Sequence, residues 1–279
     1  MKTLASELFK EMVGRPESQV DLVSAALLIA WDEYPSLDIQ RYLGEIDSMA
    51  AVLRSEIDFS IEARGLDAIG ILNHFLFHTS GFCGNTEDYY DPRNSYLNEV
   101  LDRRLGIPIT LSLVFMEVGK RLGMRIEGVG LPGHFIVKCL HAGSEVFVDP
   151  FNRGEILTAD ECRKRFEAQY GTGFQFKRSF LNSATKYQIL TRMLANLKRI
   201  YLERQELQKA LVAIEKILLI DPELHSEIRD RGAVHFKLNN FSAALADWIR
   251  YLEVQPNAAD AAQIKNQMNV AGQLLALRN

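Results

Sequence analysis

The sequence predicts an α+β fold with a mainly helical N-terminal part, a helix packed on an antiparallel sheet in the middle, and pairs of α-helices towards the C-terminus. Three observations predict this order. Apolar residues recur at helical spacing up to about residue 79, the spacing shifts towards two after Gly123, and the last third of the chain repeats itself. We therefore predict a helical subdomain over 1–80, a helix-on-sheet core over 81–183 and a repeat array over 184–279.

The pattern of the first 80 residues is typical of several packed helices. Apolar residues lie three or four positions apart from Leu22 to Ile29 and again from Leu43 to Leu53, and Pro16 and Pro35 interrupt the pattern. These breaks separate the expected helices from one another.

The core is expected to begin with a loop and a short helix. Residues 81–91 are rich in Gly, Asn and Asp, which is typical of a loop, and a helix should follow over about 96–105. Pro108 then fits the first turn of a second helix, because a proline there loses no hydrogen bond. Apolar residues cover most of the circumference of this helix as far as Leu122, so we expect it to be buried at the centre of the domain.

Period-two patterning after this helix predicts three strands, in RIEGVG, GHFIVKCL and EVFVDPF, with residues 141–144 as a hairpin loop. If Leu140 pairs with Glu145, His134 and Asp149 become diagonal neighbours on one face of the sheet, and a register shifted by two residues places them directly opposite. Either register brings an imidazole within reach of a carboxylate, the relation in which an Asp orients a general-base His. The alternative is a pair that only ties two strands together.

The last third of the chain has a period of 34 residues, the spacing between Pro222 and Pro256. With that shift Ala210 falls on Ala244, and Trp248 takes a packing position of the repeat. The period resembles that of tetratricopeptide repeats, in which each unit is a helical hairpin.

The second unit departs from the repeat pattern where Arg231 and His235 stand in place of the usual Leu and Tyr. Two units and a closing helix over 258–277 make a short array. Because about three units are usually needed for stability, we expect this array to lean on the preceding domain.

Four motifs between Asn94 and Leu157 point to a known family: NSYLNEVL, RLGIPITLSL, LPGHF and VDPF. Together they resemble the transglutaminase-like superfamily. With its repeats, the chain is similar to a bacterial family that joins a transglutaminase-like domain to tetratricopeptide repeats, sometimes labelled regulators of invasion genes and related to one F-box protein of animals. The resemblance implies a papain-like core in which a buried helix begins at a nucleophilic Cys, and it assigns the catalytic His and Asp to His134 and Asp149.

The resemblance fails at the nucleophile. Counting through Gly106 and Gly123 places Pro108 at the position of the family's catalytic Cys. Thr110 and Ser112 lie near the start of the same helix, and a hydroxyl activated by His is chemically feasible, although such hydroxyls more often bond to the backbone.

One of the three cysteines is a candidate to replace the missing nucleophile. Cys139 points to the opposite face of its strand from His134, and Cys162 follows the sheet, which leaves Cys83 in the preceding loop as the candidate nucleophile. Their number and spacing match neither a disulfide framework nor a zinc or redox motif.

Composition excludes several classes of function. The formal net charge is −4 and no block of five like charges occurs, so we expect no nucleic-acid partner. No apolar run approaches the roughly 20 residues of a membrane span, so we expect no membrane partner and a cytoplasmic protein. His74 and His78 have metal-site spacing, but their apolar neighbours favour a buried helix end, so we predict no metal and no cofactor.

We expect a protein without catalysis of the usual kind that binds a protein or peptide through its repeats and its residual cleft. The rival is an amide hydrolase or transamidase with His134 as the base, Asp149 as its orienting carboxylate and Cys83 as a displaced nucleophile. A third reading keeps the fold only as a scaffold for the repeats. The partner, the oligomeric state and the biological process stay open.

Overall fold

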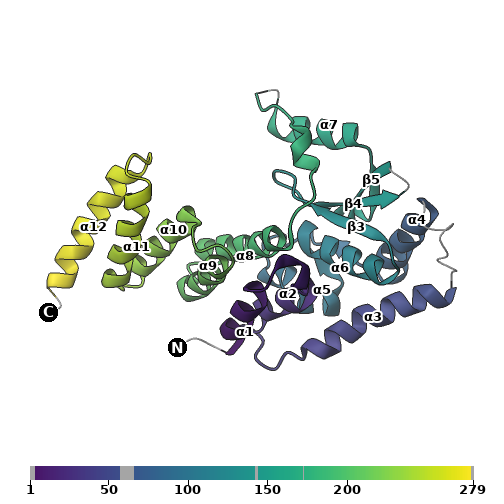
Figure 1. The fold of residues 1–279 in the computed structure, drawn as a ribbon, viewed down its shortest axis with the longest axis horizontal. Coiled ribbons are helices and arrows are strands. Elements are labelled where there is room, and N and C mark those ends of the chain that lie inside the picture. Colours follow the sequence, from purple (N-terminus) through teal and green to yellow (C-terminus); the bar gives the residue numbers. More distant parts are fainter. Residues whose placement is uncertain (1–3, 57–65, 142–143, 172, 278–279) are drawn as a thin grey trace. The chain divides into compact units, whose positions relative to one another are not determined.

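The computed structural model describes residues 4–56, 66–141, 144–171 and 173–277 (Figure 1). The chain divides into two compact units. The first contains residues up to Ala5 and Pro16–Met193, and the second contains Ser6–Arg15 and the chain from Leu194 onwards. The division into three parts at residues 80 and 183 remains a prediction.

Helices form the N-terminal part of the first unit, as predicted. They are η1 (Glu17–Gln19), α2 (Leu22–Ala30), α3 (Ile39–Glu56) and α4 (Leu66–His74), and α4 continues into the π-helical turn η3 (Phe75–Thr79). The N-terminus of α2 is capped by Asp21, whose side chain accepts a hydrogen bond from the Ser24 backbone N–H at 2.6 Å. Nearly every residue of α2 is buried, which places it inside the helical layer.

The predicted burial of His74 and His78 is wrong. Both side chains are exposed, and their rings stack on each other with centroids 5.3 Å apart. The buried face of this segment instead carries Leu72, Leu76 and Phe77. The two histidines share the opposite face because they are four residues apart.

The central helix begins at Pro108, as the sequence predicts. It is preceded by a set of short elements: β1 (Cys83–Gly84), η4 (Pro92–Ser95), α5 (Leu97–Arg103) and β2 (Leu105–Gly106). Here β1 pairs in parallel with β2, a contact the sequence analysis did not anticipate. Helix α5 is shorter than expected, because Arg104 turns into the left-handed region with φ 61° and ends it. Helix α6 (Pro108–Arg121) is buried along most of its length.

A four-stranded antiparallel sheet follows α6. Its order is β3 (Arg125–Val129), β4 (Ile136–His141), β5 (Ser144–Asp149) and β6 (Glu155–Leu157). Leu140 pairs with Glu145, so the predicted register is confirmed. The hairpin is tighter than predicted, since both His141 and Ser144 belong to the strands, and its two central residues lie outside the described residues. The short strand β6 was not predicted.

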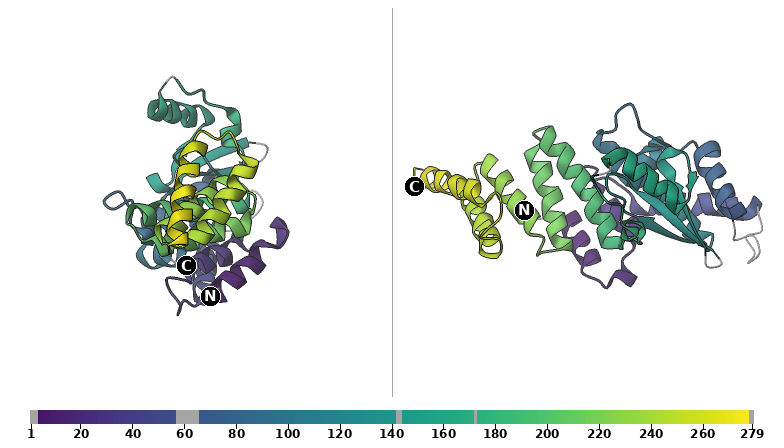
Figure 2. Two further views of the ribbon diagram at one scale, coloured as in Figure 1. Left: turned by 90° about the vertical axis from the view of Figure 1, so that its left-hand side faces the viewer. Right: turned by 90° about the horizontal axis from the view of Figure 1, so that it is seen from above.

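Helices cover both faces of this sheet (Figures 1 and 2). On one face α6 packs so closely that a Cβ at Gly119 would lie 2.3 Å from the Ile126 side chain. On the other face α7 (Ala159–Tyr170) and η6 (Arg178–Leu181) pack on β4 to β6. The core of this second face contains Ile136, Phe147, Leu157, Cys162 and Leu181.

The second unit is the predicted helical array. Its helices are α8 (Lys186–Glu203), which begins in the first unit, then α9 (Leu207–Ile220), α10 (His225–Lys237), α11 (Phe241–Val254) and α12 (Ala261–Ala276). Trp248 is 1% exposed and packs so closely on Gly232 that a Cβ there would lie 2.7 Å from the indole ring. The predicted core role of Trp248 is confirmed.

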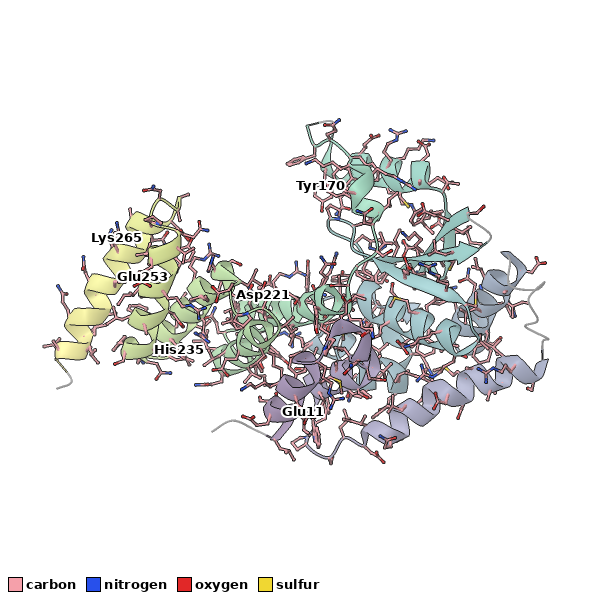
Figure 3. The ribbon with its side chains drawn as sticks, viewed as in Figure 1. Glu11, Tyr170, Asp221, His235, Glu253 and Lys265 are labelled. Carbon is pink, nitrogen blue, oxygen red and sulfur yellow. The ribbon has the colours of Figure 1, made fainter. Side chains whose placement is uncertain are left out.

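Both departures from the repeat pattern have structural consequences. The Arg231 guanidinium donates to both carboxylate oxygens of Asp247, at 2.6 and 2.8 Å, and so ties α10 to α11. His235 lies half-buried near the end of α10 (Figure 3), and burial lowers its pKa.

The first helix, α1 (Leu4–Val13), supplies residues to the second unit. Its Phe9 is fully buried, and the Lys216 ammonium of α9 lies 5.4 Å from the centre of the Phe9 ring. The array is therefore built from both ends of the chain.

Candidate functional site

His134 lies on the turn between β3 and β4. The turn is closed by a backbone hydrogen bond from His134 N–H to Leu131 C=O at 3.2 Å, and Gly133 has φ +70°, a conformation that favours glycine. The Arg192 guanidinium of α8 donates to the carbonyl oxygens of Leu131 and His134, at 3.0 and 2.7 Å. Arg192 thereby holds both ends of the turn that presents His134.

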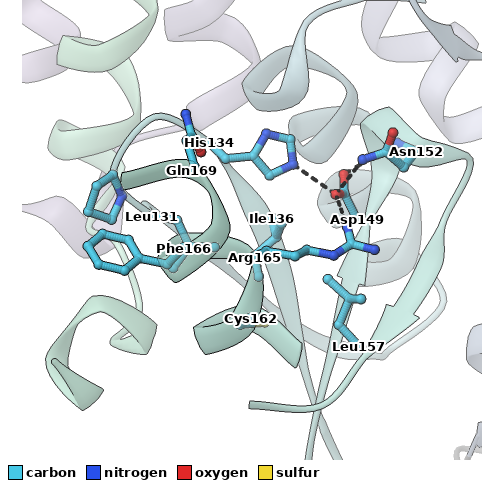
Figure 4. A pocket seen from close by; sticks show the side chains of 11 residues that line it. Leu131, His134, Ile136, Asp149, Asn152, Leu157, Cys162, Arg165, Phe166 and Gln169 are labelled. Atoms are coloured by element: carbon cyan, nitrogen blue, oxygen red, sulfur yellow. Dashed lines mark hydrogen bonds and ion pairs between the residues drawn. The ribbon is translucent and has the colours of Figure 1, made fainter. Parts of the chain in front are cut away.

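Asp149 is the last residue of β5, and its side chain is fully buried. One carboxylate oxygen, Oδ1, accepts the backbone N–H groups of Phe151 and Asn152 at 3.2 and 3.3 Å. The other, Oδ2, meets His134 Nε2 at 2.8 Å, Asn152 Nδ2 at 2.8 Å and Arg165 Nη1 at 3.2 Å (Figure 4). The predicted His134–Asp149 contact is therefore present, with two further donors on the same oxygen.

The environment keeps Asp149 ionised. Burial by itself raises the pKa of this carboxyl, but the hydrogen bonds and positive charge offered by His134, together with the bonds from Asn152, outweigh it and lower the pKa below the ordinary value. An ionised acceptor requires the hydrogen of His134 to sit on Nε2. The other ring nitrogen, Nδ1, then faces away from Asp149 and can accept a proton, as a general base does.

A pocket of about 190 Å³ opens beside this pair, on the face of the sheet covered by α7 (Figure 4). Strand and turn residues form one part of its lining, and α7 contributes Cys162, Arg165, Phe166 and Gln169. The pocket therefore depends on a helix that follows the sheet, in addition to the strands that carry the His–Asp pair.

The start of α6 does not line this pocket. Pro108 is the first residue of the helix and is buried. The Thr110 hydroxyl accepts the Ile107 backbone N–H at 3.1 Å and donates to the Asn94 carbonyl at 2.8 Å, so it closes the helix start. Ser112 is buried, and its hydroxyl has no hydrogen-bond partner within the described part of the chain.

Cys83 lies in β1, a strand that packs against the turn after Asp149. It is partly buried in β1, and its neighbour Gly84 packs against the side chain of Phe151. The Phe151 ring meets the His134 imidazole edge-on, with centroids 6.2 Å apart. Phe151 thus touches both the β1 segment and the His134 ring.

Of the two remaining cysteines, Cys162 reaches the pocket. The sequence analysis set it aside because it follows the sheet, but α7 folds back over the sheet and brings its side chain to the lining. Burial raises the pKa of the Cys162 thiol to about 11, so at neutral pH it is protonated. Cys139 is buried in β4, and burial raises the pKa of its thiol to about 12.

Sequence reasoning missed the residues that hold the His134–Asp149 pair in place, Asn152, Arg165 and Arg192, and the pocket residues Phe166 and Gln169. Asn152 had a local signal, since it follows Asp149 within the turn that the carboxylate caps. Arg165 and Arg192 had no such local signal. Arg165 follows Asp149 by 16 residues, and Arg192 follows His134 by 58 residues. Only the packing of α7 and α8 brings them to the site.

Comparison with known proteins agrees with this geometry. A family model described as the transglutaminase-like superfamily matches residues 40–195. The chain belongs to this superfamily. A second model, described as tetratricopeptide repeat, matches residues 197–269. The transglutaminase-like domain thus contains the His134 site, and the repeats follow it.

Several proteins are similar in sequence to this chain over two thirds of it or more. A UPF0162 protein of Xylella fastidiosa is 36% identical over 272 residues, which cover 96% of each chain. A UPF0162 protein of Vibrio cholerae is 32% identical over 68% of this chain and 70% of its own. F-box only protein 21 of Mus musculus is 30% identical over 68% of this chain but only 28% of its own length.

In residues 4–56, 66–141, 144–171 and 173–277, no helix is both long and apolar enough to cross a bilayer.

Proposed function

We propose that this protein is a protein- or peptide-binding module that lacks the covalent chemistry expected of a transglutaminase-like site. Its repeats and the pocket beside His134 are the binding surfaces. The cytoplasm remains the compartment we infer from composition.

The observation that carries the proposal is a His–Asp pair beside a pocket without an activated nucleophile. The one thiol that lines the pocket belongs to Cys162, whose pKa is raised to about 11 by burial. The family's nucleophile position is held by Pro108, and the nearby Thr110 hydroxyl is engaged by backbone groups. A base and its orienting carboxylate bind and polarise a ligand, but without a nucleophile they form no acyl intermediate.

The repeats supply the second support. Tetratricopeptide-type helix pairs stack into a curved array, and such arrays present extended surfaces to protein partners. In this array the Arg231–Asp247 ion pair ties α10 to α11 within one unit, and the Lys198–Glu227 ion pair joins α8 to α10 of the next unit.

The decisive experiment measures catalysis and thiol reactivity on the full chain. We expect no incorporation of a fluorescent primary amine into casein above the rate without protein, and no change on His134→Ala. We also expect iodoacetamide at pH 6 to alkylate Cys83 at the same rate in the wild type and in His134→Ala, measured by peptide mass spectrometry. Cys83→Ser is the control for peptide assignment.

The rival function, an amide hydrolase or transamidase, predicts the opposite result for the alkylation of Cys83. If Cys83 is a displaced nucleophile, its alkylation at pH 6 depends on His134, because the imidazole then stabilises the thiolate. A His134-dependent rate, or amine incorporation that Cys83→Ser abolishes, would overturn the proposal. The contact of Phe151 with both the β1 segment and His134 is what makes this rival worth testing.

A further inference from the structure

The pocket beside His134 has an extensive apolar wall. Leu131, Ile136, Leu157 and Phe166 contribute to it, and Figure 4 shows Leu131 and Phe166 on the His134 side of the pocket and Leu157 below Asp149. A cavity of roughly 150 Å³ holds a benzene-sized group. The volume of about 190 Å³ therefore suits a single large apolar side chain.

The polar wall carries charges that already neutralise one another. Arg165 pairs with Asp149 at 3.2 Å and also with Glu155, so one guanidinium spans both carboxylates. A ligand carboxylate would have to compete with both for Arg165. The charge pattern thus favours an uncharged occupant.

An aromatic path leads from the surface towards this pocket. The Phe166 ring, which lines the pocket, lies 4.9 Å from the Tyr170 ring, and Tyr170 lies 6.1 Å from Phe174. Phe174 is 63% exposed, a large fraction for an aromatic side chain. Tyr170 also covers the His134 turn, since a Cβ at Gly133 would lie 2.3 Å from its hydroxyl oxygen.

The rim of the pocket offers polar groups of the kind that a peptide backbone needs. Gln169 is exposed on α7 and lines the pocket, and its amide both donates and accepts hydrogen bonds. Apolar walls with a few polar groups at the edge are typical of sites that recognise a side chain together with its backbone.

We infer that this pocket binds a large apolar side chain, of the leucine or phenylalanine type, within an uncharged peptide segment. The inference rests on the proposed function and deepens it by naming the class of ligand. Phe174 and Tyr170 supply further apolar surface for the residues that flank the bound side chain.

Four small amides test this assignment on the full chain labelled at Leu and Ile methyl groups. We expect N-acetyl-L-phenylalaninamide and N-acetyl-L-leucinamide to shift the methyl NMR signals of Ile136 and Leu157, with dissociation constants on the order of 1 mM for ligands of this size. N-acetylglycinamide and the α-amide of N-acetyl-L-aspartic acid should bind at least ~10-fold more weakly, because the first lacks a side chain and the second carries a side-chain carboxylate.

A matched pair of variants locates the binding. Gln169→Trp fills the mouth of the pocket and should raise the dissociation constant at least ~10-fold, whereas Ala168→Trp, one residue away on the exposed surface of α7, should leave it unchanged. The wild-type titration decides the question even if Gln169→Trp does not fold. Absence of shifts with all four amides, preference for the aspartate amide, or equal binding to both variants would overturn the inference.

The amide titrations and the transamidation assay distinguish an error in the pocket assignment from an error in the proposed function. If no amide binds and no transamidation occurs, the pocket assignment is wrong while binding through the repeats stands. If transamidation occurs, the proposed function is wrong whichever amides bind.

Discussion

The replacement Asp149→Asn tests whether the buried carboxylate organises the site. Asparagine keeps the shape and one oxygen, so the backbone N–H groups of Phe151 and Asn152 retain an acceptor. The new amide NH₂ cannot accept the hydrogen bonds that Oδ2 receives from His134, the Asn152 side chain and Arg165. The variant therefore removes three charge-assisted bonds without creating a cavity.

The expected loss of stability depends on how exposed each of the three donors is and on whether it keeps another hydrogen-bond partner. Arg165 is 40% exposed and keeps Glu155 as a partner. The loss of its bond to Asp149 therefore lowers the free energy of unfolding only slightly. The His134 side chain is 25% exposed, and its hydrogen bond to a charged group contributes about 1.5–3 kcal/mol, whereas Asn152 is exposed and its bond contributes less. Since the neutral amide also costs less to bury than a carboxylate, we expect a net loss of about 2–4 kcal/mol at pH 7.

The loss should depend on pH with a definite sign. The folded-state pKa of Asp149 is lowered, so its contribution is fully present above the unfolded value of about 3.9 and disappears as pH falls through the folded-state pKa. Wild type and Asp149→Asn should therefore differ fully in stability at pH 5–7, and the difference should shrink only as pH falls from about 3.9 through the folded-state pKa.

Urea unfolding followed by tryptophan fluorescence measures this difference. Trp31 belongs to the same unit as Asp149, and Trp248 belongs to the other, so a Trp248→Phe background makes Trp31 the reporter of the relevant unit. Asp160→Asn is the control, because this exposed carboxylate on α7 also has a lowered pKa, from bonds to Lys164 and Arg163, and should contribute far less. A loss below about 1 kcal/mol at pH 7, or a loss that does not shrink between pH 5 and about pH 3, would refute the reasoning.

Three further outcomes follow from the array and from the start of α6. Ala244→Trp should lower stability by about 1–3 kcal/mol in thermal unfolding, because Ala244 is fully buried among the helices, and an unchanged melting temperature would contradict this packing. Arg231→Leu should cost about 3 kcal/mol by leaving the buried Asp247 carboxylate unpaired, and adding Asp247→Leu should restore most of it; additive losses in urea unfolding would speak against the pair. Pro108→Cys should give a thiol that iodoacetamide alkylates slowly at pH 6 and independently of His134, because this position is buried and does not line the pocket; fast alkylation that His134→Ala slows would contradict this placement.

Local patterns in the sequence were enough to predict much of the architecture. The buried helix from Pro108, the pairing of Leu140 with Glu145 and the 34-residue repeat all depend on neighbours close in the chain. A helix or hairpin has a fixed geometric period, so apolar spacing and turn position suffice to specify it. The contact between His134 and Asp149 agrees with that register, although His134 lies on the turn before β4 and not within the strand where the sequence placed it.

Packing between elements far apart in the sequence determines which side chains surround the His134–Asp149 pair. Cys162 and Arg165 reach the pocket only because α7 folds back over the sheet, and Arg192 holds the His134 turn from a helix 58 residues further along. Phe9 joins the array from the opposite end of the chain. These contacts leave no periodic signal, because they arise when burial of apolar faces drives separate elements together. The sequence by itself therefore determined the elements and the His–Asp pair, and the tertiary structure decided what surrounds that pair.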